Sequence, residues 1–332
     1  MAYDPLYKVT PHLLTLIEEI TLLKAKIDIS PISVSWVPRL TKEAFNKMSH
    51  SSTAIEGNPL TLKEVEILVD GGSIPQTPVK YVREIFNYLA ALRYISNGSD
   101  TATIGHKDIF TLHKLIGETV LDRGPVGAYR NYQVYVGNHR PPKAARVPIL
   151  MSELLEWLNG KGKGLPAVLT SAILHYQFEH IHPFGDGNGR VGRLLATWEL
   201  FRRKFDTRHI FSVDEVYWEN RQRYYAAIDN VRTRDGDLTG WLEFVAEAVQ
   251  YTLEKVWMRI EAVKTQEDIP LELSPKQERL LRLLRVSSMS IQEIQDALGV
   301  KKAGAHLILR PLKEANLVKR VGGHKTGKYI LA

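Results

Sequence analysis

The chain has 332 residues, of which 44% are hydrophobic and 24% charged, so it is long enough for two or three folded domains. It contains no cysteine, which excludes a disulfide framework. No apolar run approaches the roughly 18 residues of a membrane span, and the first residues show no basic segment followed by an apolar stretch. We therefore expect a soluble, cytoplasmic protein with no membrane partner.

The net charge of +7 is concentrated near the C-terminal end. Residues 269–332 hold 12 basic and 5 acidic residues, whereas residues 1–268 hold 32 of each. A basic module thus follows a neutral body, and basic modules often bind nucleic acid. A solvated basic face is the alternative.

Helical periodicity dominates the first 266 residues. In residues 11–27, Leu13, Leu16, Ile20 and Ile27 recur at spacings that give one apolar stripe. The same pattern predicts helices at residues 41–56, 62–69, 79–95, 107–120, 147–159, 166–180, 188–204, 216–233 and 238–266. We expect a mainly α fold, with an N-terminal helical region at residues 1–100 and a helical core at residues 101–266.

The stretch "YRNYQVYVGNHRPP" breaks the helical pattern. Tyr132, Val134 and Val136 alternate along it, and a turn follows at Gly137-Asn138. This pattern predicts a short β-hairpin that could shape a substrate groove. A plain connecting loop is the alternative.

The C-terminal end carries a different arrangement. Residues 266–274 are typical of a linker, and residues 274–332 of three short helices followed by two strands around a glycine-rich turn, which is a winged helix-turn-helix. Ser290 and Glu293 form a capping box for the second helix, and Gly299 ends it. Lys302 and Arg310 on the third helix would suit a DNA backbone, although such modules also mediate protein contacts.

The stretch "HIHPFGDGNGRVGR" at residues 180–193 is rich in glycine. Its Gly-x-Gly-x-x-Gly pattern is that of dinucleotide-binding folds, but the preceding residues have helical rather than strand periodicity, and Asp206, the first acid beyond the helix, comes early. Val191, Leu195 and Trp198 instead lie on one face of a helix that begins near Asn188. The free N–H groups at such a helix end bind anions.

The polar side chains of this stretch predict phosphate chemistry. Arg190 and Arg193 are about 60° apart on the helix and can lean toward one polyphosphate. Asp186 would suit a magnesium ion that bridges phosphate oxygens, and His182 would suit a general base for a hydroxyl. A zinc site of His175, His180 and His182 matches no familiar spacing. The pattern therefore indicates attack of an alcohol on a metal-bound nucleoside triphosphate.

"HPFGDGNGRVGR", from His182 to Arg193, resembles the signature of the Fic family, His-Pro-Phe-x-Asp/Glu-Gly-Asn-Gly-Arg-x-x-Arg, with every defined position present. The resemblance implies transfer of AMP from ATP to a Ser, Thr or Tyr hydroxyl of a target protein, with release of pyrophosphate. It implies that His182 is the base and that Asp186 holds Mg²⁺. It places ATP against Gly187, Asn188, Gly189, Arg190, Val191, Gly192 and Arg193.

A second motif, "SSTAIEG", resembles the inhibitory Ser-x-x-x-Glu-Gly motif of Fic proteins. Ser52 and Glu56 lie at i and i+4 of an inhibitory helix over residues 41–57, so they share a face. A carboxylate paired with Arg193 would occupy the guanidinium group that the γ-phosphate engages. A well-built helix corner is the alternative, and the resemblance leaves the reverse removal of AMP open.

The resemblance covers about residues 3–249. Gly127-x-x-Arg130 and the segment from Val134 to Pro142 look like the family's flap, which would align a target segment by adding a strand to its edge. The nucleotide would then also contact Val136, Gly137, Asn138 and His139. "ENRQRYYAAID" resembles the helix beside the base and ribose, with Tyr224 and Tyr225 as candidates, although tyrosines in helices more often pack in the core.

Two rival functions remain open. One is a Doc-like protein kinase that passes on the γ-phosphate, although its loop departs from the Gly-Asn-Gly-Arg found here. The other is a DNA-binding regulator whose Fic body only senses nucleotide. The sequence also leaves self-modification and a homodimer open.

Overall fold

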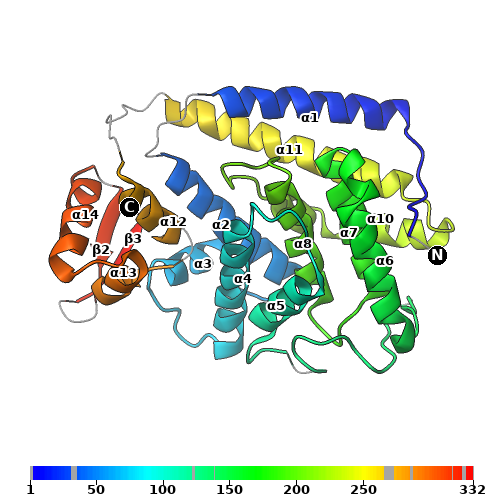
Figure 1. The fold of residues 1–332 in the computed structure, drawn as a ribbon, viewed down its shortest axis with the longest axis horizontal. Coiled ribbons are helices and arrows are strands. Elements are labelled where there is room, and N and C mark those ends of the chain that lie inside the picture. Colours follow the sequence, from blue (N-terminus) through cyan, green and yellow to red (C-terminus); the bar gives the residue numbers. More distant parts are fainter. Residues whose placement is uncertain are drawn as a thin grey trace.

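The computed structural model describes residues 3–30, 36–121, 124–137, 139–264, 273–284, 287–315, 317–323 and 327–331. In these ranges the chain is mainly helical, as predicted (Figure 1). The helices of the body are α1 (Pro11–Ile29), α2 (Trp36–Ile55), α3 (Leu62–Val69), α4 (Val79–Asn97), α5 (His106–Gly117), α6 (Val147–Asn159), α7 (Ala167–Ile181), α8 (Asn188–Arg202), α9 (Val213–Glu219), α10 (Arg221–Thr233) and α11 (Thr239–Lys264). No helix among the described residues is long and apolar enough to cross a membrane.

The long helices α1 and α11 run side by side along one edge of the molecule, and α7 and α8 occupy its middle (Figure 1). The first residues of α1 are fixed by the side chain of Thr10, which accepts a hydrogen bond from the Leu13 N–H at 3.0 Å. Such a cap satisfies one of the free N–H groups of the helix. The predicted apolar stripe of α1 faces inward, with Leu13, Ile20 and Ile27 all buried.

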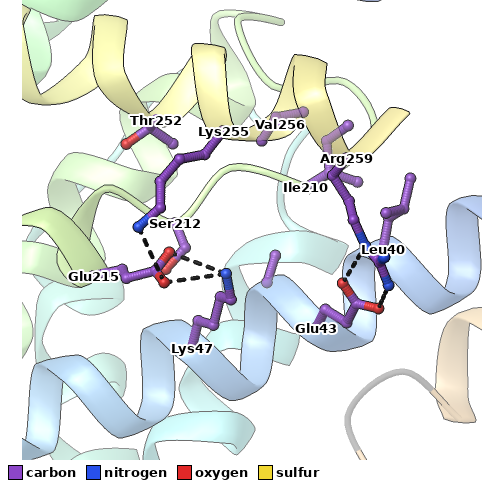
Figure 2. Close-up of a pocket in the computed structure, with 11 residues that line it drawn as sticks. Leu40, Glu43, Lys47, Ile210, Ser212, Glu215, Thr252, Lys255, Val256 and Arg259 are labelled. Carbon is purple, nitrogen blue, oxygen red and sulfur yellow. Dashed lines mark hydrogen bonds and ion pairs between the residues drawn. The ribbon is translucent and has the colours of Figure 1, made fainter. Parts of the chain in front are cut away.

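Helix α2 is held against α9 and α11 by two sets of ion pairs (Figure 2). Glu215 of α9 binds Lys47 of α2 at 3.1 Å and Lys255 of α11 at 3.4 Å. Glu43 of α2 binds Arg259 of α11 at 2.7 Å. The Glu215 network is partly buried and fixes relative positions better than a single exposed pair such as Glu43–Arg259. The C-terminal end of α2, which carries the predicted inhibitory motif, therefore has a defined place.

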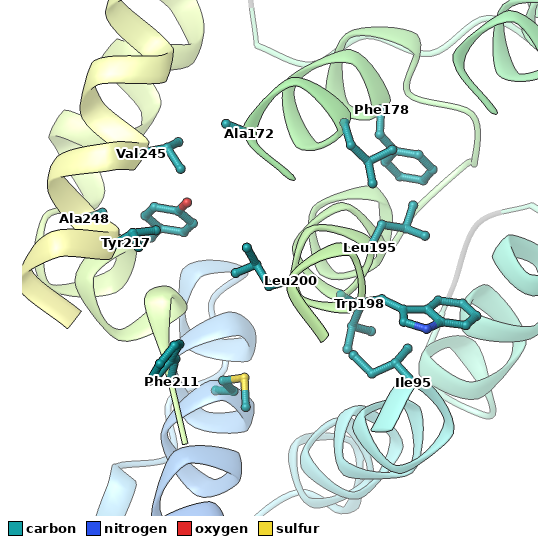
Figure 3. Close-up of a cluster of buried hydrophobic side chains, with 14 of the residues drawn as sticks. Ile95, Ala172, Phe178, Leu195, Trp198, Leu200, Phe211, Tyr217, Val245 and Ala248 are labelled. Atoms are coloured by element: carbon teal, nitrogen blue, oxygen red, sulfur yellow. The ribbon is translucent and has the colours of Figure 1, made fainter. Parts of the chain in front are cut away.

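One hydrophobic core joins the N-terminal region to the predicted helical core. Figure 3 shows Ile95 of α4 beside Trp198 of α8, with Phe178 of α7 nearby and Tyr217 of α9 on the opposite side. The Trp198 indole also donates a hydrogen bond to the Gly98 carbonyl at 3.0 Å. Because these side chains belong to one cluster, α2 and α4 are part of the frame that positions α7 and α8.

The predicted helix at residues 216–233 is wrong, since the structure has two helices there. α9 ends at Glu219 and α10 begins at Arg221. At the break, the N–H and the side-chain amide of Asn220 both donate to the Val216 carbonyl, each at 3.1 Å. An asparagine that bonds the backbone in this way competes with continuation of the helix. Helix α2 also begins at Trp36, earlier than the predicted residue 41.

The predicted β-hairpin is borne out only as a single antiparallel bridge, and its paired strands are shorter than expected. In residues 124–137 and 139–143 the structure has one isolated bridge, between Val136 and His139, and no other strand pairing. Arg130 explains the difference, because its guanidinium group donates to the carbonyls of His182 at 2.8 Å, Tyr132 at 3.0 Å and Pro142 at 2.6 Å. Side-chain bonds to backbone thus take the place of a strand ladder.

The C-terminal region contains α12 (Pro275–Leu284), α13 (Ile291–Leu298) and α14 (Lys302–Glu314), with strands β1 (Met289–Ser290), β2 (Val318–Val321) and β3 (Lys328–Leu331). The strands form an antiparallel sheet in the order β1-β3-β2, of which β1 was not predicted. Both the Ser290–Glu293 capping box and the Gly299 stop are confirmed. The region has its own hydrophobic core, and its assignment as a winged helix-turn-helix stays a prediction.

The C-terminal region lies against the α2, α3 and α4 side of the body (Figure 1). The Lys42 ammonium group of α2 binds Asp70 at 2.6 Å and also reaches the Leu331 carbonyl of β3 at 3.4 Å. Arg93 of α4 donates to the Ser287 hydroxyl at 2.5 Å. The predicted linker at residues 266–274 lies almost wholly outside the described residues.

Candidate active site

The glycine-rich stretch forms the turn between α7 and α8. α7 ends at Ile181, and His182 caps it in the left-handed conformation, with φ of 50° and its N–H bonded to the Phe178 carbonyl at 2.9 Å. α8 begins at Asn188, directly after Gly187, whose φ of 79° suits glycine. The predicted helix start is thus confirmed. The described strands all lie in residues 289–331, so no parallel sheet precedes this turn in the described part of the chain.

Asn188 holds the turn closed. Its side-chain amide donates to the Phe184 carbonyl at 3.1 Å, and its side-chain oxygen accepts from the Phe184 N–H at 2.9 Å. Phe184 itself is fully buried and stacks on the His113 ring, with the ring centroids 3.7 Å apart. The loop that carries His182 and Asp186 is therefore fixed to the core from both ends.

His113 of α5 is a site residue that the sequence analysis missed. Its Nδ1 accepts a hydrogen bond from the Gly127 N–H at 2.8 Å, so its Nε2 carries the proton and donates to the Asp186 carbonyl at 3.0 Å. Burial lowers the His113 pKa to about 4, which keeps the ring neutral. One imidazole thus ties the segment before Arg130 to the glycine-rich turn.

Glu179 of α7 is a second missed residue, and it lies beside His182. Its Oε2 is 3.6 Å from His182 Nδ1, and burial alone would raise its pKa. His182, His175 and Arg193 together lower the Glu179 pKa below its usual value, so the carboxylate stays charged. The 3.6 Å separation is longer than a hydrogen bond, but the negative charge still favours a proton on Nδ1, which leaves Nε2 as the more basic atom. The i, i+3 spacing to His182 could have identified Glu179.

Arg193 is buried and binds both residues of the second motif. It donates to the Ser52 hydroxyl at 2.7 Å, to the Ser52 carbonyl at 2.9 Å and to Glu56 Oε1 at 2.7 Å. Burial would lower the Arg193 pKa, but Glu56 and other anionic groups raise it well above its usual value. The pairing expected between Glu56 and Arg193 is confirmed.

Glu56 lies over the first turn of α8. A Cβ atom on Gly189 would stand 2.2 Å from Glu56 Oε1, so with any other residue this carboxylate would have to shift from its present position. The free N–H groups and positive end of a helix dipole favour an anion at this point. The carboxylate therefore occupies the place that the sequence predicts for a phosphate.

Arg190 pairs with carboxylates other than Glu56. Its guanidinium group lies 3.7 Å from Glu84 of α4 and 3.7 Å from Asp186, and its side chain is only 7% exposed. Glu84 also accepts a hydrogen bond from the Asn58 side chain at 2.9 Å. No pattern in the sequence pointed to Glu84, which is separated from Arg190 by more than a hundred residues.

Asp186 is the one member of the turn with a substantially open side chain, 42% exposed. Its Oδ1 accepts from the Gly187 N–H at 2.5 Å. Among the described residues no cluster of three or more His, Cys, Asp or Glu could hold a metal ion, so the zinc alternative has no support. One open carboxylate at an anion-binding turn fits magnesium, which keeps waters and substrate phosphates as its other ligands.

The structure places the predicted nucleotide-binding residues outside the turn in different surroundings. Tyr224 is buried in an aromatic cluster with its hydroxyl 3.2 Å from His175 Nε2, which is the packing role. Tyr225 is 40% exposed, and its hydroxyl reaches the Ile55 carbonyl at 3.5 Å. Val136 and His139 form the isolated bridge around Gly137, and Asn138 lies outside the described residues. In the first turns of α8, Val191 is fully buried and Gly192 packs on Glu179 and His175.

Comparison with known proteins assigns the part of the chain that contains this turn to a family. Residues 103–200 match the family model described as Fic/DOC family. The chain therefore contains a Fic/DOC family domain.

Curated relatives and solved structures agree with this assignment. The chain is 34% identical over 228 residues to "Protein adenylyltransferase Fic" of Aedes aegypti, covering 65% of this chain and 42% of the relative. For the protein of the same name from Drosophila melanogaster the values are 30%, 276 residues, 80% and 53%. The chain thus spans about half the length of the curated relatives it matches.

Among solved structures, a Fic family protein from Desulfovibrio desulfuricans G20 is similar with a TM-score of 0.66 and 28% identity, covering 99% of this chain and 98% of that one. Fic-1 from C. elegans gives a TM-score of 0.66 and 25% identity, covering 77% of this chain and 74% of that one. The first of these similarities extends through the C-terminal region.

Two buried histidines predict how stability depends on pH. Burial lowers the pKa of His113 and of His175 to about 4, against 6.5 for a free histidine. Between these values the unfolded chain binds more protons, so stability is full above pH 6.5 and falls as the pH drops toward 4. Each histidine contributes up to about 1.4 kcal/mol per pH unit. Denaturant unfolding measured from pH 7.5 to 5 should show the loss.

Two variants serve as controls for this prediction. His113→Gln should make the fall shallower, because one titrating group is removed. His306→Gln should leave the slope unchanged, since His306 is exposed on α14. Equal slopes in all three proteins would contradict the assignment of the effect to the buried rings.

Proposed function

We propose that the chain is a self-inhibited protein adenylyltransferase. It transfers AMP from ATP to a Ser, Thr or Tyr hydroxyl of a target protein and releases pyrophosphate. The support is the glycine-rich turn at the start of α8, together with relatives that are named for this activity. In the mechanism, a protein hydroxyl attacks the α-phosphorus of ATP, a P–O bond to the β-phosphate breaks, and the hydroxyl proton is removed.

His182 is the proposed base for that proton. With Glu179 at its Nδ1, the proton of the neutral ring stays on that atom and Nε2 accepts the proton of the hydroxyl. The imidazolium that forms is then stabilised by the same carboxylate. Glu179 acts here as a positioning residue, in the way that a carboxylate orients a histidine in other catalytic sites.

The turn and α8 are the proposed binding site for the phosphates. The N–H groups from Gly187 to Gly189 would face phosphate oxygens, and Arg193, once released from Glu56, would engage the γ-phosphate. Asp186 would hold Mg²⁺, which supplies neutralisation of charge on the phosphate oxygens. Arg190 is kept near the turn by Glu84 and Asp186.

The proposal of self-inhibition rests on one observation, the contact between Glu56 and Arg193. Glu56 Oε1 lies 2.7 Å from Arg193 and directly above Gly189, so the γ-phosphate and Glu56 compete for one guanidinium group. ATP would then bind in a pose that the attacking hydroxyl cannot use. The exposed fraction of Glu56, 35% against 1% for Arg193, makes Glu56 the partner that can move away.

Glu56→Gly should raise self-modification and modification of target proteins by about ten- to a hundredfold. A charge-assisted hydrogen bond is worth about 1.5–3 kcal/mol, and its loss returns Arg193 to the phosphate. Incorporation of label from ATP marked on the α-phosphate measures the change.

The control is Glu43→Gly, because Glu43 lies on α2, the helix that ends one residue before Glu56, and is paired with Arg259 instead. It loosens α2 without freeing Arg193, so its rate should stay close to that of the unaltered protein. If both variants were activated alike, release of the helix and not of Arg193 would be the cause. If neither were, the motif would be structural only.

The position of the label distinguishes AMP transfer from the rival kinase reaction. In the Glu56→Gly background, label on the α-phosphate should enter protein and label on the γ-phosphate should not. His182→Ala should lower the rate by about a hundredfold or more, because general base catalysis contributes roughly that amount. Entry of the γ-label instead would establish phosphoryl transfer and overturn the proposal.

The target segment is proposed to lie along residues 134–142. Val136 and His139 there form one bridge, and the His139 ring is close to His180, with ring centroids 5.3 Å apart. An extended segment on this edge would bring its hydroxyl toward the turn, as in recognition by strand addition. Self-modification, reverse removal of AMP and a homodimer remain open in this proposal.

Binding of DNA by the C-terminal region is a second proposed function. The solvent side of α14 carries Lys302, His306 and Arg310, all exposed, and the region holds the whole net charge of the chain. A basic helix with one open face suits the phosphate backbone of a duplex.

The predicted result is a gel shift with duplex DNA that weakens steeply as salt is added, because phosphate contacts release counterions. The double variant Lys302→Ala, Arg310→Ala should abolish the shift. The control Arg203→Ala, which changes the residue directly after α8, should not. Absence of any shift at low salt would leave the region as a protein-contact module.

A further inference from the structure

A cleft of about 640 Å³ lies between α12 of the C-terminal region and the helical body. Its walls come from α2, α4, the segment at residues 207–209 and α12. The side chains that bear on the argument are Phe45, Arg93, Arg208, Arg279 and Arg282. None of the residues that line the cleft belongs to the glycine-rich turn.

The cleft is strongly basic. Four arginines line it, against a single carboxylate, that of Asp100, which is paired with Lys204. Arg282 is 58% exposed and stands 3.8 Å from Glu278 on its own helix, which is a weak pair. Arg279 is exposed and makes no hydrogen bond or ion pair within the part of the chain that the structure describes. Like charges that face one cleft repel unless an anion lies between them.

Of the four arginines, Arg93 bears most directly on whether the cleft binds an anion. It is half-buried, its Nη2 donates to the Ser287 hydroxyl, and its Nε is buried with no hydrogen-bond partner among the described residues. Burial lowers the Arg93 pKa, and the nearby charge of Glu293 only partly offsets this effect. Arg208, in contrast, donates to three carbonyls at the end of α1 and is a fixed wall of the cleft.

We propose that this cleft binds a phosphate-bearing small molecule of nucleotide size. Its volume falls within the roughly 300–1,000 Å³ of small-molecule sites. Guanidinium groups pair with phosphate through two parallel hydrogen bonds, which is why arginine is preferred where phosphate is recognised. Val37 and Leu283, which are partly exposed, supply an apolar side on which a base or sugar can lie.

The ligand would link two parts of the chain that otherwise share few polar contacts. Arg279 and Arg282 belong to α12, whereas Arg93 belongs to α4, so a ligand that contacts both walls would connect the C-terminal region to the body. Val37 and Phe45 belong to α2, the helix that ends beside Glu56. This second site is independent of the proposed adenylyltransferase activity, since it uses none of the same residues.

Hydrogen exchange on the full chain locates the binding without any activity measurement. With inorganic pyrophosphate or AMP as the probe, we expect slower exchange in residues 93–100, 207–209 and 275–284. Each probe should also protect the start of α8 if the turn binds phosphate, and the two regions are separate in the peptide map. Comparison of the two probes distinguishes a free phosphate site from one that also reads the nucleoside.

The variant Arg279→Ala with Arg282→Ala should remove protection from the cleft and weaken binding there by about tenfold or more. Arg310→Ala, an exposed arginine of α14, should leave it intact. Arg279→Glu alone provides a second test, should the double variant fold poorly. Three results would overturn the proposal. The first is protection that persists in both cleft variants, and the second is protection confined to residues 182–193. The third is protection of residues 275–284 by duplex DNA but by neither probe.

Discussion

The contact between Arg193 and the end of α2 is the interaction on which the rest of the site depends. A buried guanidinium group must have hydrogen-bond acceptors, because an unpaired charge in the interior is very costly. Ser52 supplies two of them and Glu56 the third. Two of these acceptors belong to a residue that is itself buried, so they stay in place, whereas the Glu56 carboxylate is open to solvent and replaceable. A triphosphate chain has the chemistry to replace it.

This arrangement works only because α2 and α8 are held by the same core. The ion pairs of Glu215 and Glu43 fix one side of α2, and the shared hydrophobic cluster fixes the other (Figures 2 and 3). The C-terminal region touches the same helix through Lys42 and the β3 carbonyl of Leu331. Helix α2 therefore contacts the rest of the body, the turn and the C-terminal region, and α4 adds a second contact to the C-terminal region through Arg93 and Ser287.

The turn itself combines tight packing with one exposed side. Its backbone is held in place by contacts with Phe184, Asn188 and His113, while the Asp186 side chain is exposed to solvent. Rigid support beneath an open polar edge is what a site for a charged ligand requires, because the binding groups then need no rearrangement. His182 fits the same plan, since its left-handed backbone and its contact with Glu179 set the direction of the ring.

The sequence by itself determined the features that depend on neighbours along the chain. Periodic apolar residues predicted α1, α3 and α6, the capping box at Ser290 marked a helix start, and the motif from His182 to Arg193 identified the turn. Only the tertiary structure decided which distant groups meet there. Glu84 at Arg190 and His113 at Asp186 come from helices far away in the chain, and no local spacing encodes such pairs. The expected hairpin is limited to one bridge for the same reason, because Arg130 bonds that segment to the turn where further strand pairing was expected.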